Sequence, residues 1–305
     1  MDTQYKRVNS FIDLNLYTYA ELRLILNCGA VIKKDPSQYY QHMRNKNVAL
    51  IFMQPSTRTR VSFEVGVNQL GGSAIILDWK NSQLTRGESI YDTAKVLSRY
   101  VNLIVIRILE HDSLLEFDAH STVPVINSLT QYSHPCQVLA DIMTYEEKMG
   151  PIEGATVSWI GDFNNMLVSW VHAATVLNFK LNVSTLEHSK ELELLLNSAK
   201  KQGANIVYDR NPHNIIQNAN VITTDAWLSM GDNNNIKSEF FNYQVNAALL
   251  KDARPDYMFL HCLPAHRGEE VTSEIIDGPN SYIFDEAENR LHIQKAIMLW
   301  CLNLL

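Results

Sequence analysis

Short apolar runs alternate with helix-like stretches along most of the chain, and this alternation constrains the fold more than any other feature of the sequence. Most of the runs are continuously apolar, which is typical of strands that are covered on both faces of a sheet. We predict strands at Val48–Met53, Ser73–Leu77, Leu103–Ile108, Val123–Ile126, Ala155–Ile160, Lys180–Thr185, Asn205–Tyr208, Val221–Thr224, Tyr257–His261 and Tyr282–Phe284.

Helical patterns separate most of these predicted strands. They lie at Ser89–Tyr100, Gln137–Met149, Met166–Asn178, Ser189–Gln202 and Asn246–Asp252. Strands that alternate with helices form βαβ units, whose strands are parallel. We therefore predict an α/β fold with two domains, each a mostly parallel β-sheet flanked by helices.

The best internal boundary is Lys148–Gly154, where glycine, proline and charge gather just before a predicted strand. It divides the chain into a first domain, residues 1–148, and a second domain, residues 149–287. The remaining residues, 288–305, include an apolar C-terminal helix, and we expect this helix to pack back on the first domain. A polar stretch, Met230–Asn235, is interpreted as a mobile loop.

The composition narrows the class of protein. An apolar content of 46% with 19% charged residues describes a soluble globular protein with a sizeable core. The net charge of −7 argues against nucleic acid as a partner. The four cysteines form no Cys-x-x-Cys pair, which favours reduced thiols in a cytoplasmic protein. Neither an apolar leader at the N-terminus nor a membrane-length run is predicted.

The segment Ser56–Arg60, with the sequence Ser-Thr-Arg-Thr-Arg, follows the first predicted strand directly. Ser56 can cap a new helix, and the first amides of a helix attract anions. The alternative is an ordinary capped helix with two surface arginines. Because basic residues in a first turn oppose the helix dipole, we favour a phosphate-binding site.

Other chemically capable residues also follow predicted strands, and ligands of parallel sheets bind beyond the carboxyl ends of the strands. These residues are Arg107, His134–Gln137, Gly161–Asn165, Asp225–Gly231, His261–Pro264 and Asp285–Arg290. Taken singly, each has a structural explanation; their joint occurrence at strand ends favours a functional site.

Four of these segments have alternatives. The His/Cys pairs at His134–Cys136 and His261–Cys262 match no common zinc spacing, so we predict no metal. Gly161–Asn165, with Glu187 as a ribose-binding acid, lacks two of the three glycines of a dinucleotide loop. The acidic run Asp285–Glu288 is interpreted as the solvated start of a helix.

With these motifs in order, the sequence resembles the ornithine carbamoyltransferase family along essentially its whole length. The resemblance is carried by Ser56–Arg60, His134–Gln137, Asp225 with Ser229-Met230-Gly231, and His261–Pro264. The Ser-Met-Gly loop and Cys262 distinguish this family from the aspartate enzyme, which carries proline at the latter position. Ala226, at a position more often threonine, and Cys136, at a variable one, are small departures.

The resemblance implies transfer of the carbamoyl group of carbamoyl phosphate to the side-chain amine of L-ornithine, giving L-citrulline and phosphate, in arginine biosynthesis. It implies no cofactor and a homotrimer with active sites at subunit interfaces. The first domain is then the carbamoyl phosphate-binding domain and the second the ornithine-binding domain. The implied ligands of carbamoyl phosphate are Ser56, Thr57, Arg58, Thr59, Gln83, Arg107, His134, Gln137, Cys262, Leu263 and Arg290. Gln83 resembles the residue that this family contributes across a subunit interface.

The implied ornithine ligands are Asn165, Asp225, Ser229 and Met230, and the implied catalytic residues are Cys262, Arg107, His134 and Asp225. The segment 229–236 resembles a lid that closes on ornithine. The amine must be neutral to react, and three acceptors for its proton stay open: a Cys262 thiolate, Asp225 and the departing phosphate. Other possible functions are carbamoyl transfer to putrescine or an acylated ornithine, an NAD-dependent oxidoreductase, and a non-catalytic sensor of carbamoyl phosphate.

Overall fold

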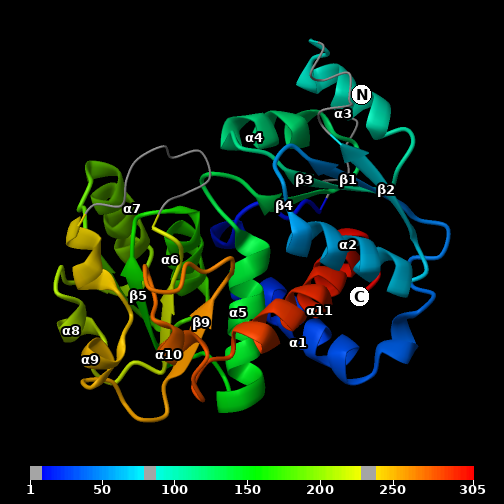
Figure 1. The fold of residues 1–305 in the computed structure, drawn as a ribbon. Helices are drawn as coiled ribbons and strands as arrows, with labels where there is room; N and C mark the ends of the chain where they lie inside the picture. The colour runs from blue at the N-terminus through cyan, green and yellow to red at the C-terminus, as the bar shows by residue number, and fades with distance from the viewer. Residues whose placement is uncertain (1–8, 79–86, 228–237) are drawn as a thin grey trace. The chain divides into compact units, whose positions relative to one another are not determined.

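The computed structural model describes residues 9–78, 87–227 and 238–305. They form two compact units (Figure 1). The first unit contains the described residues up to Leu16, then Ala20–Cys136 and Arg290–Leu305, and the second contains Tyr17–Tyr19 and Gln137–Asn289. The chain enters the second unit within helix α5 (Pro135–Met149) and returns to the first within helix α11 (Ile283–Cys301).

The first unit is built on a four-stranded sheet in which every pair of neighbouring strands is parallel. The sheet order is β2-β1-β3-β4, with β1 at Asn47–Phe52, β2 at Ser73–Asp78, β3 at Leu103–Arg107 and β4 at Val125–Leu129. Helices α3 (Ile90–Leu97) and α4 (His111–His120) cover one face, and α2 (Thr57–Gln69) with α11 lies on the other (Figure 1). Helix α1 (Tyr19–Lys34) and the 3-10 turns Leu14–Leu16 and Pro36–Tyr39 complete the unit.

The second unit is built on a five-stranded parallel sheet with the order β7-β6-β5-β8-β9. Its strands are β5 (Thr156–Gly161), β6 (Lys180–Thr185), β7 (Asn205–Tyr208), β8 (Val221–Thr224) and β9 (Met258–His261). Its further helices are α6 (Asn165–Val176), α7 (Lys190–Lys201), α8 (Pro212–Ile215), α9 (Ala247–Leu250) and α10 (Ser273–Ile276), with a 3-10 segment at Ser238–Tyr243. The prediction of two helix-flanked parallel sheets is confirmed.

Each sheet has a point at which the strand order reverses. In the first unit it lies between β1 and β3, where Phe52 is opposite Arg107. In the second unit it lies between β5 and β8, where Trp159 is opposite Thr223. Loops that leave neighbouring strands in opposite directions open a crevice there, which is the usual ligand position in parallel sheets. The chemically capable segments after these strands therefore lie where a ligand site is expected.

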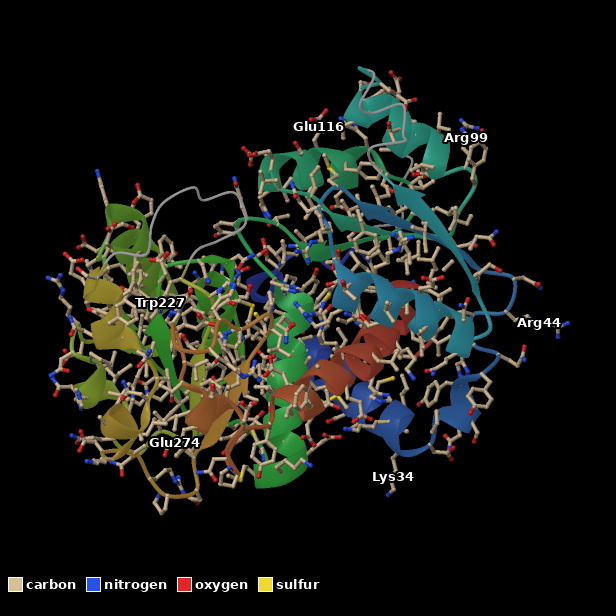
Figure 2. All side chains as sticks on the ribbon, in the orientation of Figure 1. Lys34, Arg44, Arg99, Glu116, Trp227 and Glu274 are labelled. Atoms are coloured by element: carbon tan, nitrogen blue, oxygen red, sulfur yellow. The ribbon has the colours of Figure 1, made fainter. Side chains whose placement is uncertain are left out.

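Burial follows the apolar pattern of the sequence. Strand β1 is buried from Val48 to Phe52, and β3 is buried throughout. In the second unit Trp227 packs in the core, while charged side chains such as Lys34, Arg44 and Glu116 lie on the surface of the first unit (Figure 2). Among the described residues, no helix combines the length and the apolar character needed to cross a membrane.

The predicted strand at Tyr282–Phe284 is wrong. Ser281 makes only an isolated bridge with Phe259, and Ile283 already begins α11. Phe284 is 71% exposed, so the short apolar run reflects a helix turn with one side chain in solvent rather than a buried strand. A run of three residues is too short for periodicity to distinguish the two.

Candidate active site

The Ser56–Arg60 segment lies at a strand-to-helix junction, as predicted. Helix α2 begins at Thr57, and Ser56 occupies its N-cap position with extended backbone angles. The Ser56 hydroxyl makes no capping bond to the helix; instead it accepts a hydrogen bond from Arg107 Nη1 at 3.3 Å. The first turn of α2 contains no acidic residue. The positive end of the helix and the Arg58 guanidinium therefore favour an anion.

Two further arginines reach this helix start from distant parts of the first unit. Arg107 ends strand β3 and is 7% exposed. Arg290, on α11, is 3% exposed and donates from Nη2 to Thr59 Oγ1 at 2.5 Å. Guanidinium groups remain protonated under all ordinary conditions. The first unit thus concentrates fixed positive charge at one helix N-terminus.

His134 is buried just before α5. Burial, followed by the nearby charges of Arg290, Arg107 and Arg58, lowers the pKa of His134 well below its usual value. The imidazole is therefore neutral at pH 7. A neutral ring can donate a hydrogen bond from one nitrogen without adding to the positive charge of the three guanidinium groups.

In the second unit, Asp225 follows β8 and meets groups from two other loops. Cys262 Sγ donates to Asp225 Oδ1 at 3.2 Å, and Asn164 Nδ2 donates to Asp225 Oδ2 at 3.0 Å. The Ala226 amide also donates to Oδ1, at 2.8 Å. These contacts orient the carboxylate between a thiol and an amide.

Burial, then the negative charges of Asp225, Glu286 and Asp141, raise the pKa of the Cys262 thiol well above its ordinary value. The sulfur is consequently a thiol at neutral pH, and it acts as a donor to Asp225. A thiolate in this position would face three carboxylates. The Cys262 thiolate is therefore disfavoured as the acceptor of a substrate proton.

Gln137, near the start of α5, is fully buried. Its Nε2 donates to Asp141 Oδ1 at 2.8 Å and to Glu286 Oε1 at 2.9 Å. Both amide protons are thus used, and the side-chain carbonyl Oε1 finds no hydrogen-bond partner among the residues that the structure describes. The two carboxylates leave Gln137 as an oriented acceptor, since a carboxylate can only accept.

Sequence reasoning missed Asn164, Asp141 and Glu286. The interpretation of Asp285–Glu288 as a solvated helix start is wrong for Glu286, which is 1% exposed and accepts the His261 amide at 2.9 Å. Helical spacing could have indicated two of them, because Glu286 lies one turn before Arg290 and Asp141 one turn after Gln137. Asn164 carries the ordinary signal of a helix N-cap.

The structure brings the described candidate residues together in two groups. The first unit gathers Ser56, Thr57, Arg58, Thr59, Arg107, His134 and Arg290 around the start of α2. In the second unit Asp225 and Cys262 are in contact, Leu263 follows Cys262, and Asn165 is the first residue of α6. Gln83, Ser229 and Met230 lie outside the described residues, as do the whole of the expected lid and of the expected mobile loop.

Two clusters in the described part of the chain offer donor atoms within 4.8 Å of one another. One is Asp225, His261 and Cys262, and the other is His266, Glu269 and Glu270. In the first cluster the thiol proton already bonds the carboxylate, whereas a metal needs the thiolate. The expectation that the site uses no metal stays a prediction.

Comparisons with known proteins cover nearly the whole chain. Residues 9–147 match the family model of the aspartate/ornithine carbamoyltransferase carbamoyl-P binding domain, and residues 153–301 match the model of the Asp/Orn binding domain. The expected linker at Lys148–Gly154 includes the residues between the two matches.

Individual relatives agree with the family models. The chain is 52% identical to ornithine carbamoyltransferase of Nitrobacter winogradskyi and 50% identical to that of Bradyrhizobium diazoefficiens, with 98% of each chain covered in both comparisons. Among solved structures, ornithine carbamoyltransferase from Burkholderia thailandensis is similar with a TM-score of 0.89 and 41% identity, covering 97% of this chain and 99% of its own. The Pyrococcus furiosus enzyme has a TM-score of 0.88 and 43% identity over 95% of this chain and 96% of its own.

Proposed function

The chain belongs to the aspartate/ornithine carbamoyltransferase family, and from this premise we propose how its residues transfer the carbamoyl group of carbamoyl phosphate to the side-chain amine of L-ornithine. The products are L-citrulline and phosphate. The observation that carries the choice of an amine acceptor is the Cys262 thiol beside the Asp225 carboxylate, at 3.2 Å. The carboxylate supplies the negative charge and the hydrogen-bond acceptors that a cationic amine needs.

The start of α2 binds the phosphate group in this proposal. Ser56, Thr57, Arg58 and Thr59 supply hydroxyl, amide and guanidinium donors where the helix dipole is positive. Arg107 already bonds Ser56, so one guanidinium extends the phosphate site toward the carbonyl end of the substrate. Bidentate guanidinium contacts are well suited to a phosphate.

Arg107 and the neutral His134 stabilise the tetrahedral intermediate. As the amine attacks, negative charge develops on the carbamoyl oxygen, and prearranged donors lower the barrier there. Arg290 is oriented by its bond to Thr59 and adds charge to the same region. Loss of one such donor typically costs about 10²–10³-fold in kcat.

The carbamoyl NH2 group needs acceptors rather than donors. Gln137 Oε1 is such an acceptor, and its orientation is set by Asp141 and Glu286. The backbone carbonyls of Cys262 and Leu263 are the other proposed acceptors. An NH2 group with two protons distinguishes a carbamoyl group from an acetyl group of similar size.

The attacking amine must lose a proton. Its free pKa resembles that of lysine, about 10.4, so the neutral form at pH 7 costs roughly 4–5 kcal/mol. Asp225 attracts the ammonium form and orients it. Because the Cys262 pKa is raised, the thiol cannot act as the base, and the departing phosphate takes the proton as the C–O bond to phosphate breaks.

The resemblance to the family implies roles for four further residues and for the assembly. Asn165, Ser229 and Met230 bind the amino-acid head of ornithine, Gln83 completes the phosphate site of a neighbouring subunit, and the enzyme is a homotrimer that serves arginine biosynthesis. Four free cysteines fit a cytoplasmic location. Large apolar side chains that remain exposed on the first unit, such as Val61 and Ile75, support an assembly in which they are covered.

Paired substitutions test the assignment of the two ligands. Arg58→Ala should lower kcat by about 10²–10³-fold and weaken carbamoyl phosphate binding, because it removes a phosphate ligand. Asp225→Asn should raise the KM for ornithine and lower kcat while carbamoyl phosphate binding stays intact. Steady-state citrulline formation and calorimetric binding of each substrate provide the measurements.

The exposed Arg60 supplies a matched control on the same helix. Arg60→Ala should have kinetics close to those of the unaltered enzyme. If each variant lost affinity for carbamoyl phosphate and for ornithine equally, Arg58 would not be a ligand of the first substrate alone, nor Asp225 of the second. A strong preference for putrescine over ornithine would overturn the choice of substrate.

A further inference from the structure

His261 and Glu270 form a buried pair that the mechanism above does not use. Their side chains are both 0% exposed, and His261 Nε2 lies 3.0 Å from Glu270 Oε1. The chain between them turns back through Gly268, whose amide donates to the Val271 carbonyl at 2.8 Å. The His266 amide donates to Glu270 Oε1 as well, at 2.7 Å. The loop therefore places the Glu270 carboxylate beside the imidazole ring of His261, the last residue of β9.

The protonation of the His261 ring follows from its second contact. The Leu263 amide donates to His261 Nδ1 at 2.9 Å. A backbone amide can only donate, so Nδ1 must accept and carries no proton. The proton of the neutral ring is then on Nε2, from which it bonds Glu270. Burial alone raises the pKa of Glu270, but the hydrogen bonds from His261 and the His266 amide outweigh it and lower the pKa, so the carboxylate is ionised.

The backbone that donates this bond to His261 Nδ1 has an unusual conformation. Leu263 has a φ of +56°, in the left-handed region that residues with a side chain rarely adopt. Such a conformation persists only where surrounding contacts determine it. The bond from the Leu263 amide to the imidazole closes a tight turn around Cys262, and the His261 amide is separately bonded to Glu286.

We propose that Glu270 and His261 are positioning residues for the Cys262–Leu263 segment: the carboxylate selects the Nε2–H tautomer of the imidazole, and Nδ1 then fixes the turn. This inference rests on the proposed function for the roles of the Cys262 thiol and the two backbone carbonyls. The tautomer itself does not depend on that function. An Nδ1–H tautomer would direct a proton at the Leu263 amide and remove the bond that closes the turn.

Nitrogen NMR of histidine-labelled enzyme tests the tautomer without any substrate. The His261 ring, assigned through the signal lost in His261→Asn, should show a protonated Nε2 and an unprotonated Nδ1 at neutral pH. The same pattern should persist in Glu270→Gln, whose amide oxygen can accept both N–H groups that Glu270 Oε1 accepts. An Nδ1–H ring or an imidazolium ring in the unaltered enzyme would overturn the proposal.

Kinetics test the consequence for the site. Glu270→Leu should lower kcat/KM for ornithine on the order of 10²-fold, as displacement of a reacting group by about 1 Å does. Glu270→Gln should stay within about fivefold of the unaltered enzyme, the cost of roughly one modest hydrogen bond. Glu269→Gln is the matched control, because the neighbouring carboxylate is partly exposed and lies 3.6 Å from His266 Nδ1, and its kinetics should not change.

A second pair of variants covers the case in which Glu270→Leu does not fold. His261→Asn retains an oxygen at the position of Nδ1 and should keep more activity than His261→Ala, which removes both contacts. Equal activity of the two His261 variants, or full activity in a folded Glu270→Leu, would contradict the positioning role. An unaltered enzyme that makes no citrulline would contradict the proposed function instead, while the NMR result still decides the tautomer.

Discussion

Lys295 places an ammonium group inside the packed interior of the first unit. The residue is 1% exposed, and its Nζ donates to Gln69 Oε1, at the end of α2, at 2.9 Å. Its stem lies close to Gly66, where an added Cβ would meet Lys295 Cγ at 3.3 Å. Burial lowers the pKa of Lys295 from 10.5 to about 8. The charge is thus retained at pH 7 at the expense of stability.

The lowered pKa of Lys295 makes the free energy of unfolding depend on pH. Between pH 8 and pH 10.5 the unfolded chain keeps the Lys295 proton while the folded chain loses it, so stability rises with pH in this range. Lys295→Met should increase the free energy of unfolding at pH 7 by about 2 kcal/mol, from about 3 for the removed charge less about 1 for the lost hydrogen bond. Urea unfolding provides the measurement.

The advantage of Lys295→Met should shrink by about 1 kcal/mol between pH 7 and pH 9, as the lysine becomes neutral in the folded state. Lys201→Met, at an exposed position at the end of α7, is the control and should show no such trend. A Lys295→Met variant that is less stable than the unaltered protein at pH 7 would mean that the ammonium has stronger partners than Gln69.

At the scale of elements, α6 shows how a helix terminus serves both stability and the site. Asn164 Oδ1 accepts the Met166 and Leu167 amides, at 3.0 and 3.2 Å, and caps the helix. The other end of the same amide, Nδ2, donates to Asp225 Oδ2. One side chain thus ties the start of α6 to the carboxylate that follows β8. Ser189 caps α7 in the same way, by accepting the Leu192 amide.

Two substitutions at Asn164 separate these roles. Asn164→Ala should cost about 1 kcal/mol of stability through the lost cap. Asn164→Ser keeps a capping oxygen on a shorter side chain with no amide to donate to Asp225, so stability should suffer less while kcat with ornithine falls. Thermal unfolding and citrulline assays measure the two effects.

Ser189→Ala supplies the control for Asn164→Ala, because it should lower stability by a similar amount and leave the kinetics unchanged. If Asn164→Ser had the kinetics of the unaltered enzyme, the contact with Asp225 would have no part in the reaction. If it lost as much stability as Asn164→Ala, the lost stability would come from the contact with Asp225 rather than from the cap.

At the scale of the whole molecule, each unit has its own parallel sheet with its own reversal of strand order. The first unit concentrates guanidinium groups at one helix start, and the second concentrates carboxylates around Cys262. A net charge of −7 conceals this separation. Opposite local charge suits two substrates of opposite charge, a phosphate and an amine.

At this scale we predict that the protein is a homotrimer in solution. Sedimentation equilibrium should return a mass about three times 34.8 kDa. Ile75, on the edge strand β2, is 41% exposed, and Ile75→Lys should weaken the trimer because a buried ammonium on a strand edge is unfavourable. Leu194→Lys, at an exposed position on α7, is the control and should leave the mass unchanged. A single species of 34.8 kDa would contradict the trimer.

Much of the candidate site was predictable from residues that follow strands. Ser56–Arg60 and Asp225 were found this way, since the end of a parallel strand is both a local signal and the usual ligand position. The partners that orient them were not. Glu286 has the sequence context of a solvated helix start, and its spacing from Arg290 indicates at most a shared helix face, not that its carboxylate accepts from Gln137 and His261.

Local patterns in the amino-acid sequence predicted most of the strands and helices, their order, and the side chains that follow each strand, because periodicity and caps act over a few residues. Which buried polar groups meet becomes evident only in the folded chain. Gln137 and Glu286 are separated by 149 positions, and Thr59 and Arg290 by 231. Contacts of this kind depend on how the chain returns through α5 and α11, and they set the neutral state of His134 and the protonated state of Cys262.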